Sequence, residues 1–406
     1  MSSSAGRSGP FGARRVRLTL LGAAALGLSV LVGAVTGSAT PAGEPPRLFV
    51  EVPETALVGK PLDVFVSVDV PATVRVRYAE TEVEEVTRDL RVSFLAEAGT
   101  LPVEVEAEDV GGRIGRFQAF VTALWPVEVR LEAPASVTVG DPLAVILSWR
   151  REHDRGALVR VEEAYVELAG ERLEAVRRGD ELIALTSLAL QAEAGTQTLR
   201  GVVVDEFGEA HERFAELSVG VNPNPVQELN VAAGTLALVT PEGRELEAVT
   251  LATAFAAVGP EPRWEHPFVL PVAGRHTSAF GLPRRYAPGG RVSYHLGTDL
   301  AAPTGTPIVA TNDGVVRVAG MYPIKGGLVI IDHGFGVTSL YFHQSALAVE
   351  VGEVVERGQV IGYVGSTGLS TGPHLHWEMR VDGVPTAPLA WLDRRWPGGP
   401  LEEGTP

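Results

Sequence analysis

The chain contains no cysteine among its 406 residues. This absence excludes a disulfide framework, zinc sites built on thiolates, and thiol nucleophiles. Lysine is almost as scarce, since Lys60 and Lys325 are its two copies. The net charge of −16 is concentrated in residues 44–265, and such an acidic region argues against nucleic acid or anionic lipid as its partner. The hydrophobic content of 45% is ordinary for a globular protein, and the length suits several domains.

Long uncharged runs are also rare, and the most extended one lies near the amino terminus. Residues 7–17 carry four arginines and no acidic residue, and residues 18–37 follow without a charge. A basic segment before an apolar one is typical of an export signal or a membrane anchor. Its twenty residues are just enough for a helix to span a bilayer. We therefore predict export to the periplasm or cell envelope, with possible retention of residues 18–37 in the inner membrane; cleavage stays open.

Two stretches in the first half of the chain resemble each other. The segment VGKPL at residues 58–62 matches VGDPL at residues 139–143, and the pentapeptide AEAGT occurs once in each copy. Runs such as DVFVSVDV alternate apolar and polar residues, which is the period of a half-buried strand. Turn residues separate these runs roughly every ten residues. The pattern predicts two tandem immunoglobulin-like β-sandwiches, residues 44–124 and 125–222, that serve as spacers or binding surfaces.

The rest of the chain divides where its composition changes. A proline-punctuated segment, VNPNPVQE, follows the second predicted sandwich, and ELEAVTLATAFAAV beyond it fits either a short helix or a strand. Short valine-rich runs between glycines then resume and continue almost to the end. The predicted divisions, in order, are an export signal or membrane anchor (1–43), two β-sandwiches (44–124 and 125–222), a linker or subdomain (223–265), a C-terminal domain (266–396) and a flexible tail (397–406).

Histidine is concentrated in the C-terminal third, where seven of the nine copies fall. Two motifs stand out there: HLGTD contains His295 and Asp299, and HLH contains His374 and His376. On a strand, residues two apart project from the same face, so both imidazoles of HLH would face one space. Two imidazoles and one carboxylate suit Zn²⁺, and three protein ligands leave the fourth position for water. The spacing leaves open which histidine of HLH binds the metal.

The sequence that frames these motifs carries a family resemblance. The elements HTSAFG, YHLGTDLAAPTGTPIVA, YFHQS and GSTGLSTGPHLHWEMR occur in the order that is typical of the lysostaphin-type (LytM-type) zinc endopeptidases. These enzymes cut peptidoglycan peptides. The resemblance covers residues 266–396 and says nothing about residues 44–222. It implies a C-terminal antiparallel-β peptidase domain of the lysostaphin-like type (duplicated hybrid motif) and thus, with the sandwiches, a mainly β protein.

The resemblance also assigns roles by position. It implies that His295, Asp299 and His376 bind one Zn²⁺ per chain. It further implies that His343 and His374 stand beside the metal without binding it. There they would orient or deprotonate the attacking water and stabilise the tetrahedral oxyanion.

Two more residues are candidates for lining the substrate groove. Tyr341 precedes His343 by two residues and would share its face of a strand. Gln344 stands where leucine is more common in the family. Trp377 should point away from the metal if His376 points toward it, so we expect it in the core.

The predicted function is a cell-envelope zinc endopeptidase that hydrolyses peptide bonds in peptidoglycan stem peptides or cross-bridges by a zinc-activated water. The alternative is a non-catalytic scaffold, or an activator of another cell-wall hydrolase, on the same fold. Some family members have lost their ligands in this way, whereas all five positions are intact here. The segment VEVGEVVERGQVIGYVG resembles the hairpins of lipoyl or biotinyl carriers, but such carriers need a lysine at the hairpin tip and this segment has none. The partner of the two sandwiches is not evident from the sequence.

Overall fold

The computed structural model describes residues 43–153, 159–221, 224–229, 233–285, 290–392 and 396. The predicted export segment at 18–37 and the predicted tail at 397–406 lie outside the described residues. Among the described residues, no helix is long and apolar enough to cross a membrane. The chain divides into two compact units between Ala123 and Leu124. Most elements in both units are strands, which confirms the prediction of a mainly β protein.

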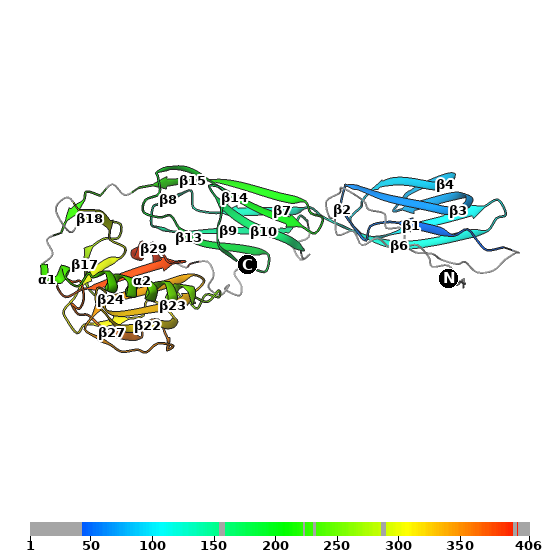
Figure 1. Cartoon of the computed structure of the whole chain (residues 1–406). Helices are drawn as coiled ribbons and strands as arrows, with labels where there is room; N and C mark the ends of the chain where they lie inside the picture. Colours follow the sequence, from blue (N-terminus) through cyan, green and yellow to red (C-terminus); the bar gives the residue numbers. More distant parts are fainter. Residues whose placement is uncertain are drawn as a thin grey trace, which may run out of the picture. The chain divides into compact units, whose positions relative to one another are not determined.

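The first unit is a six-stranded sheet that folds around its own core (Figure 1, blue to cyan). Its strands are β1 (Leu48–Glu51), β2 (Thr55–Leu57), β3 (Pro61–Tyr78), β4 (Thr81–Leu95), β5 (Gly99–Asp109) and β6 (Ile114–Leu124). The long strand β3 pairs with β1 through its first half and with β5 through its second half, and its register with β4 shifts between Ser67 and Ala72. Burial alternates along β3, as the period of its sequence predicts.

The second region consists of two sheets that enclose a separate core. Its strands are β7 (Val127–Glu132), β8 (Ser136–Thr138), β9 (Pro142–Arg151), β10 (Val161–Leu168), β11 (Glu171–Arg172), β12 (Ala175–Arg178), β13 (Glu181–Ser187), β14 (Gly195–Asp205) and β15 (Ala210–Gly220). One sheet has the order β11-β10-β14-β15-β8 and the other β12-β13-β9-β7. Leu147 of β9 and Leu199 of β14 meet in the core between them. The assignment of either region to the immunoglobulin-like class stays a prediction.

Strand β13 is buried on both of its faces. Leu182 and Ala184 belong to the core of the second sandwich, whereas Ile183 and Leu185 belong to the core cluster of the C-terminal domain. A strand with four consecutive buried apolar residues has lost the alternation of a half-buried strand because both faces are covered. The second sandwich and the C-terminal domain therefore share one compact unit.

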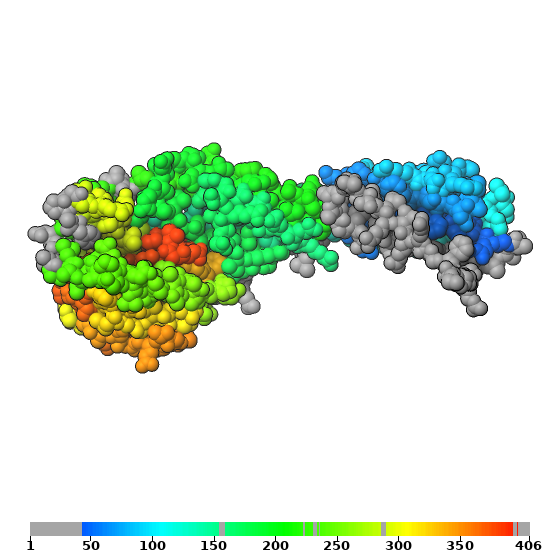
Figure 2. All heavy atoms as spheres, in the orientation of Figure 1, coloured from blue at the N-terminus to red at the C-terminus, as the bar shows by residue number. Residues whose placement is uncertain are grey.

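The linker contains β16 (Gln227–Glu228), α1 (Ala233–Leu236) and α2 (Pro241–Ala256). The segment that fitted either a helix or a strand thus forms α2. Thr240 caps this helix by accepting a hydrogen bond from the Gly243 amide, and Pro241 occupies the first turn, where its missing N–H is tolerated. The helix packs through Ala254 against the C-terminal sheet, crossing β22–β24 (Figure 1). Its outer surface forms a green ridge beside the yellow and orange strands in Figure 2.

The C-terminal domain is built on an eight-stranded antiparallel sheet of order β17-β20-β28-β24-β23-β22-β26, with β29 paired to β28. The elements are β17 (Arg275–Ser278), β18 (Pro283–Arg285), β19 (Val292–Tyr294), β20 (Thr298–Ala301), β21 (Pro307–Val309), β22 (Gly314–Tyr322), β23 (Gly326–Gly334), β24 (Val337–Gln344), β25 (Ala346–Leu347), β26 (Val354–Val355), β27 (Val360–Tyr363), β28 (Leu375–Val381), β29 (Val384–Thr386) and the 3₁₀ helix η1 (Pro388–Trp391). Strands β20, β28 and β24 are neighbours and carry the predicted site. Trp377 of β28 is fully buried in the core, as predicted.

Candidate functional site

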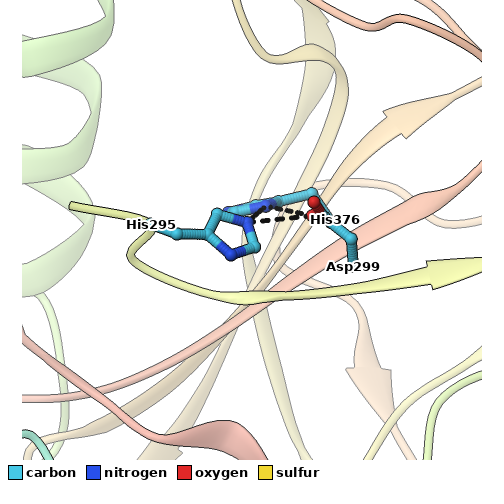
Figure 3. Close-up of side chains that lie close together, drawn as sticks. All are labelled: His295, Asp299 and His376. Atoms are coloured by element: carbon cyan, nitrogen blue, oxygen red, sulfur yellow. Dashed lines mark hydrogen bonds and ion pairs between the residues drawn. The ribbon is translucent and has the colours of Figure 1, made fainter. Parts of the chain in front are cut away.

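The three predicted metal ligands converge on one point (Figure 3). Asp299 in β20 lies directly opposite His376 in β28, and His295 precedes β20 by a short turn. The Asp299 Oδ1 atom lies 3.0 Å from His295 Nε2 and 2.8 Å from His376 Nδ1, and the two ring nitrogens are 3.0 Å apart. A tetrahedral zinc ion with bonds near 2 Å would place such atoms about 3.3 Å apart. The triangle therefore has the size and the donor set of a metal site.

The outward-facing nitrogen of each ligand histidine is held by an acceptor. His295 Nδ1 lies 2.7 Å from the carbonyl oxygen of Ala279, to which it donates, and His376 Nε2 lies 3.1 Å from Glu378 Oε1. Glu378 is itself buried and accepts a 2.6 Å hydrogen bond from Arg380 Nη2. Partners of this kind fix the orientation of a ring and leave its second nitrogen for a metal.

Asp299 is oriented by an arginine from outside the motif. Arg284 Nη2 donates to Asp299 Oδ2 at 3.1 Å and to Ser278 Oγ at 2.5 Å. Because Oδ2 is occupied, Oδ1 is the carboxylate oxygen left for the centre. Burial alone would raise the pKa of Asp299, but hydrogen bonds from His295 and His376 hold that pKa far below its usual range. The ligand is therefore an anion.

The carboxylates around the centre stabilise a positive charge. Burial lowers the pKa of His295. Burial would also lower the pKa of His376, but the hydrogen bonds and charges of Asp299 and Glu378 outweigh it and raise that pKa to about 9. Two carboxylates thus stabilise a cation between them, and a bound divalent ion would take the place of the His376 proton.

His343 and His374 stand beside the ligand triangle, with ring centroids 4.8 Å apart. His374 Nε2 lies 3.8 Å from Asp299 Oδ1. The Nδ1 atom of His343 lies 2.8 Å from the carbonyl oxygen of Thr367, and that of His374 lies 2.8 Å from the carbonyl oxygen of Gly372. Since both Nδ1 atoms donate to backbone carbonyls, Nε2 is the nitrogen that each neutral ring offers to the cavity.

The ring of His343 is buried beside the candidate ligands. Burial, reinforced by repulsion from His376 and His374, lowers the pKa of His343 to about 3. The ring is therefore neutral at ordinary pH, and its Nε2 lone pair is available. A neutral imidazole beside a metal centre can accept a proton from an attacking water.

A cavity of about 300 Å³ opens over the centre, and all five predicted metal and catalytic residues line it. Leu296, Ile324 and Leu369 give it apolar walls, while Lys325 and Tyr294 contribute polar groups. An open cavity with apolar walls and a few convergent polar groups has the character of a ligand-binding site.

Residues 293–388 match the family model described as Peptidase family M23. We call the C-terminal domain, which carries this match, the M23 domain. The DD-carboxypeptidase/endopeptidase Mpg of Neisseria meningitidis is 50% identical to it over 96 residues, which are 24% of this chain and 22% of that protein. The peptidoglycan DD-endopeptidase ShyA of Vibrio cholerae is 47% identical over 104 residues, which are 25% of this chain and 24% of that protein.

Among solved structures, the catalytic domain of lysostaphin from Staphylococcus simulans is 30% identical, with a TM-score of 0.27, and the match covers 30% of this chain and 93% of that domain. The match of residues 293–388 to the M23 family model confirms the predicted family resemblance for this part of the chain. The aligned segment spans only about a quarter of the length of the curated relatives.

The structure corrects the prediction that Tyr341 and Gln344 line the groove of the M23 domain. Both side chains are fully buried and neither lines the cavity. The Tyr341 hydroxyl accepts a hydrogen bond from the Thr311 amide at 2.9 Å and one from Ser339 Oγ at 2.9 Å. The Gln344 side chain donates to the Tyr341 carbonyl oxygen at 3.1 Å. Both residues support the strand rather than contact a substrate.

The reason for this correction is a break in the strand period. His343 has a φ of 62°, and the register between β23 and β24 shifts between Gly327 and Val329. Alternation therefore fails at this point, and the consecutive residues Phe342 and His343 both line the cavity. Tyr341 consequently does not share a face with His343.

Sequence reasoning missed two side chains that orient the candidate ligands of the M23 domain. Arg284 binds the ligand Asp299, and Glu378 binds the ligand His376. Glu378 follows His376 by two residues, so the strand period places both on one face, and a carboxylate there could have been noticed as a ring partner. Arg284 comes from β18, and no local spacing connects it to Asp299.

Proposed function

We propose that this protein is a zinc endopeptidase of the cell envelope that hydrolyses peptide bonds in peptidoglycan. The observation that carries the proposal is the ligand triangle with His343 and His374 beside it, over an open cavity. ShyA is named a peptidoglycan DD-endopeptidase and Mpg a DD-carboxypeptidase/endopeptidase, and these names support this substrate class. The bond that is cut would join amino acids of stem peptides or of their cross-bridges.

The donor set supports zinc as the metal. His295, Asp299 and His376 would hold it through two imidazole nitrogens and one carboxylate oxygen, a combination that zinc accepts readily and that leaves a position for water. When bound, zinc acidifies its water ligand toward neutrality and polarises the scissile carbonyl.

The remaining chemistry belongs to the two histidines beside the centre. His343, kept neutral by burial, accepts a proton from the attacking water through Nε2. His374 presents its Nε2 to the same space because its Nδ1 donates to a backbone carbonyl. Once protonated, either ring becomes a donor for the oxyanion or for the departing amine. The pair together would therefore supply the base and the acid of the hydrolysis.

Export is part of this proposal because peptidoglycan lies outside the cytoplasm. The arginine-flanked uncharged run at residues 18–37 would direct the chain across the inner membrane or hold it there. Fractionation of cells that produce the full-length chain, with and without residues 1–37, should place the complete chain in the envelope and the truncated chain in the cytoplasm.

Zinc content and release of fragments from purified peptidoglycan test the site. His295→Ala should lose both the metal and the activity because a ligand is gone. His374→Ala should keep the metal and lose about 10²-fold to 10⁴-fold in rate, the range for a removed acid–base group. His276→Ala, which removes an exposed histidine of β17, is the matched control and should behave like the wild type.

Mass spectrometry of the released fragments identifies the bond that is cut. Retention of both zinc and activity by His295→Ala would overturn the proposed centre. A zinc-loaded wild type that releases nothing from any cross-link type would favour the non-catalytic scaffold instead.

A further inference from the structure

Helix α2 carries one buried carboxylate. Glu247 is 2% exposed, whereas its neighbours Glu245 and Leu246 on the same helix are exposed. The helix precedes the segment that matches the M23 family model, residues 293–388, so the match itself assigns no role to it. A carboxylate is almost never buried to this extent without partners, and its partners here lie in the M23 domain.

Glu247 closes the turn between β22 and β23. Its Oε1 accepts hydrogen bonds from the backbone amides of Ile324, at 2.7 Å, and Lys325, at 3.0 Å. Its Oε2 accepts a 2.8 Å hydrogen bond from Lys325 Nζ. Hydrogen bonds to an ionised acceptor are stronger than neutral ones, so a single side chain holds this turn at three points. Ile324 and Lys325 form part of the cavity wall.

The same turn holds His343 by its backbone. The Lys325 carbonyl oxygen accepts a 2.9 Å hydrogen bond from the His343 amide. His343 needs such support because its φ of 62° lies in the left-handed region, which side-chain-bearing residues rarely adopt. The Ile324 carbonyl oxygen accepts a 2.7 Å hydrogen bond from the Leu369 amide, which ties the turn to another part of the cavity wall.

A second set of contacts leads from the turn to a metal ligand. Lys325 Nζ lies 5.4 Å from the ring centroid of Phe342. The Phe342 ring in turn stacks on the His376 ring, with centroids 4.8 Å apart and an interplanar angle of 29°. The ammonium that Glu247 holds thus contacts the aromatic side chain that packs against His376.

We propose that Glu247 is a positioning residue for the peptidase site. It latches helix α2 to the Ile324–Lys325 turn, and the Lys325 carbonyl then fixes His343 beside the metal ligands. Glu247 contacts neither substrate nor metal in this role, and its effect on turnover rests on the proposed function. Helix α2 would then support the candidate site through Glu247 rather than merely connect two domains.

Four variants of α2 separate positioning from general stability. Glu247→Ala removes all three hydrogen bonds, whereas Glu247→Gln keeps an acceptor for the two amides and loses the ion pair. Glu245→Ala removes an exposed carboxylate from the same helix. Leu251→Ala weakens the packing of the helix against the sheet without touching the turn. Thermal unfolding and zinc content are measured for each.

For peptide release, kcat of Glu247→Ala should fall about 10²-fold, the effect of misplacing a catalytic group by about 1 Å. Its KM should change less than about threefold and its zinc content should stay at one per chain, because the ligand side chains are intact. The kcat of Glu247→Gln should be about tenfold higher than that of Glu247→Ala, and the kcat of Glu245→Ala should match the wild type. A loss of kcat in Leu251→Ala equal to that in Glu247→Ala would show a merely structural role and overturn the proposal.

Hydrogen exchange gives a readout that does not depend on activity. The amides of residues 324–327 and 340–346 should exchange about tenfold faster in Glu247→Ala than in the wild type, with Glu245→Ala unchanged. Unchanged protection in Glu247→Ala would contradict the latch. If the wild type released no peptide, the proposed function would fail, while the exchange experiment would still decide whether Glu247 holds the turn.

Discussion

The two β-regions that precede the M23 domain differ most on one outer face. In the first region, Phe65 pairs with Arg91 across strands β3 and β4, and the guanidinium lies 4.8 Å from the ring of this 39% exposed phenylalanine. When VGKPL is aligned with VGDPL, Phe65 corresponds to Ile146. Ile146 pairs with Ile183, which is 4% exposed and belongs to the core cluster of the M23 domain.

Corresponding strands of the two regions thus differ in what lies on their outer face. In the first region the outer-face residues Asp63, Phe65 and Arg91 leave a solvated surface, and the core is made of that region alone. In the second region Ala144 and Ile183 make the equivalent surface apolar, and it is covered. Burial of apolar surface joins the second region to the M23 domain, whereas the first forms a unit of its own.

A charge placed on the covered face of the second region should have the largest effect on the free energy of unfolding. Ile183→Asp would bury an unpaired carboxylate between the second sandwich and the M23 domain, and we expect a loss on the order of 4 kcal/mol in the free energy of unfolding. Phe65→Asp, on the solvated face of the first region, should change it by less than about 1 kcal/mol. Denaturant unfolding of the full chain measures both. Equal, small effects would show that β13 is not covered in solution.

Substitution of two corresponding glycines, one in each region, should have an intermediate effect on stability. Gly59 and Gly140 both have positive φ, 75° and 85°, so alanine is strained at either position. A Cβ on Gly59 would meet nothing within 4 Å, whereas one on Gly140 would lie 2.3 Å from Phe280 Cε1. We expect Gly59→Ala to destabilise by about 1 kcal/mol and Gly140→Ala by about 1–3 kcal/mol more.

Gly140→Ala should also reduce peptidase activity. Phe280 follows Ala279, whose carbonyl oxygen orients the candidate ligand His295, so a displaced Phe280 should disturb the proposed metal site. Thermal unfolding and peptide release from the same preparations measure both effects. The second change Phe280→Leu, added to Gly140→Ala, should restore part of the stability; no recovery would mean that the contact with Phe280 is not the cause.

The smallest expected effect concerns two hairpins that are built alike. Asp109 and Asp205 each accept two backbone N–H groups from residues two and four positions later. The second oxygen of Asp109 accepts from the Arg113 guanidinium, and that of Asp205 lies 2.9 Å from His211 Nε2. The two hairpins share this arrangement, but the side chain that contacts the second oxygen in the second region is a histidine.

Both carboxyls should contribute stability that acid removes. Hydrogen bonds from Arg113 lower the pKa of Asp109. Burial would raise the pKa of Asp205, but hydrogen bonds from His211 and from the backbone outweigh it and lower that pKa. A lowered folded pKa means that the stabilisation is present above about pH 4, the unfolded value, and is lost as the pH falls below it. Asp109→Asn and Asp205→Asn should each flatten the fall in melting temperature between about pH 5 and pH 3; curves parallel to the wild type would contradict this.

The convergence of His295, Asp299 and His376 follows from two short motifs, whereas their role as metal ligands rests on the family resemblance and stays a prediction. The side chains that hold these residues and the cavity wall in place, Arg284 and Glu247, could not be predicted. They come from other elements, and no spacing connects them to the motifs. The prediction for Tyr341 was wrong because the strand period, which holds elsewhere, fails at the positive φ of His343. A local pattern contains no information about such a break.

The strands were largely predictable because alternation of apolar and polar residues is a local property. The helix α2 was ambiguous by its apolar pattern alone, although Thr240 and Pro241 form a helix start that could have decided it. The four consecutive apolar residues from Leu182 to Leu185 indicate a strand covered on both faces. They do not indicate what covers the second face, since that depends on a domain far along the chain.

Because lysine is scarce, the contact between Glu247 and Lys325 can be followed by chemical labelling of amines. Apart from the terminal amine, reagents that acylate amines have two targets: Lys60, exposed in the first unit, and Lys325, paired with Glu247 in the cavity wall. The Lys325 side chain is 17% exposed and its nitrogen is held by Glu247, so Lys325 should react more slowly than the exposed Lys60 for as long as this contact persists. The ratio of the two labelling rates, measured on the unmodified natural sequence, would report the opening of the groove, with Lys60 as the internal standard.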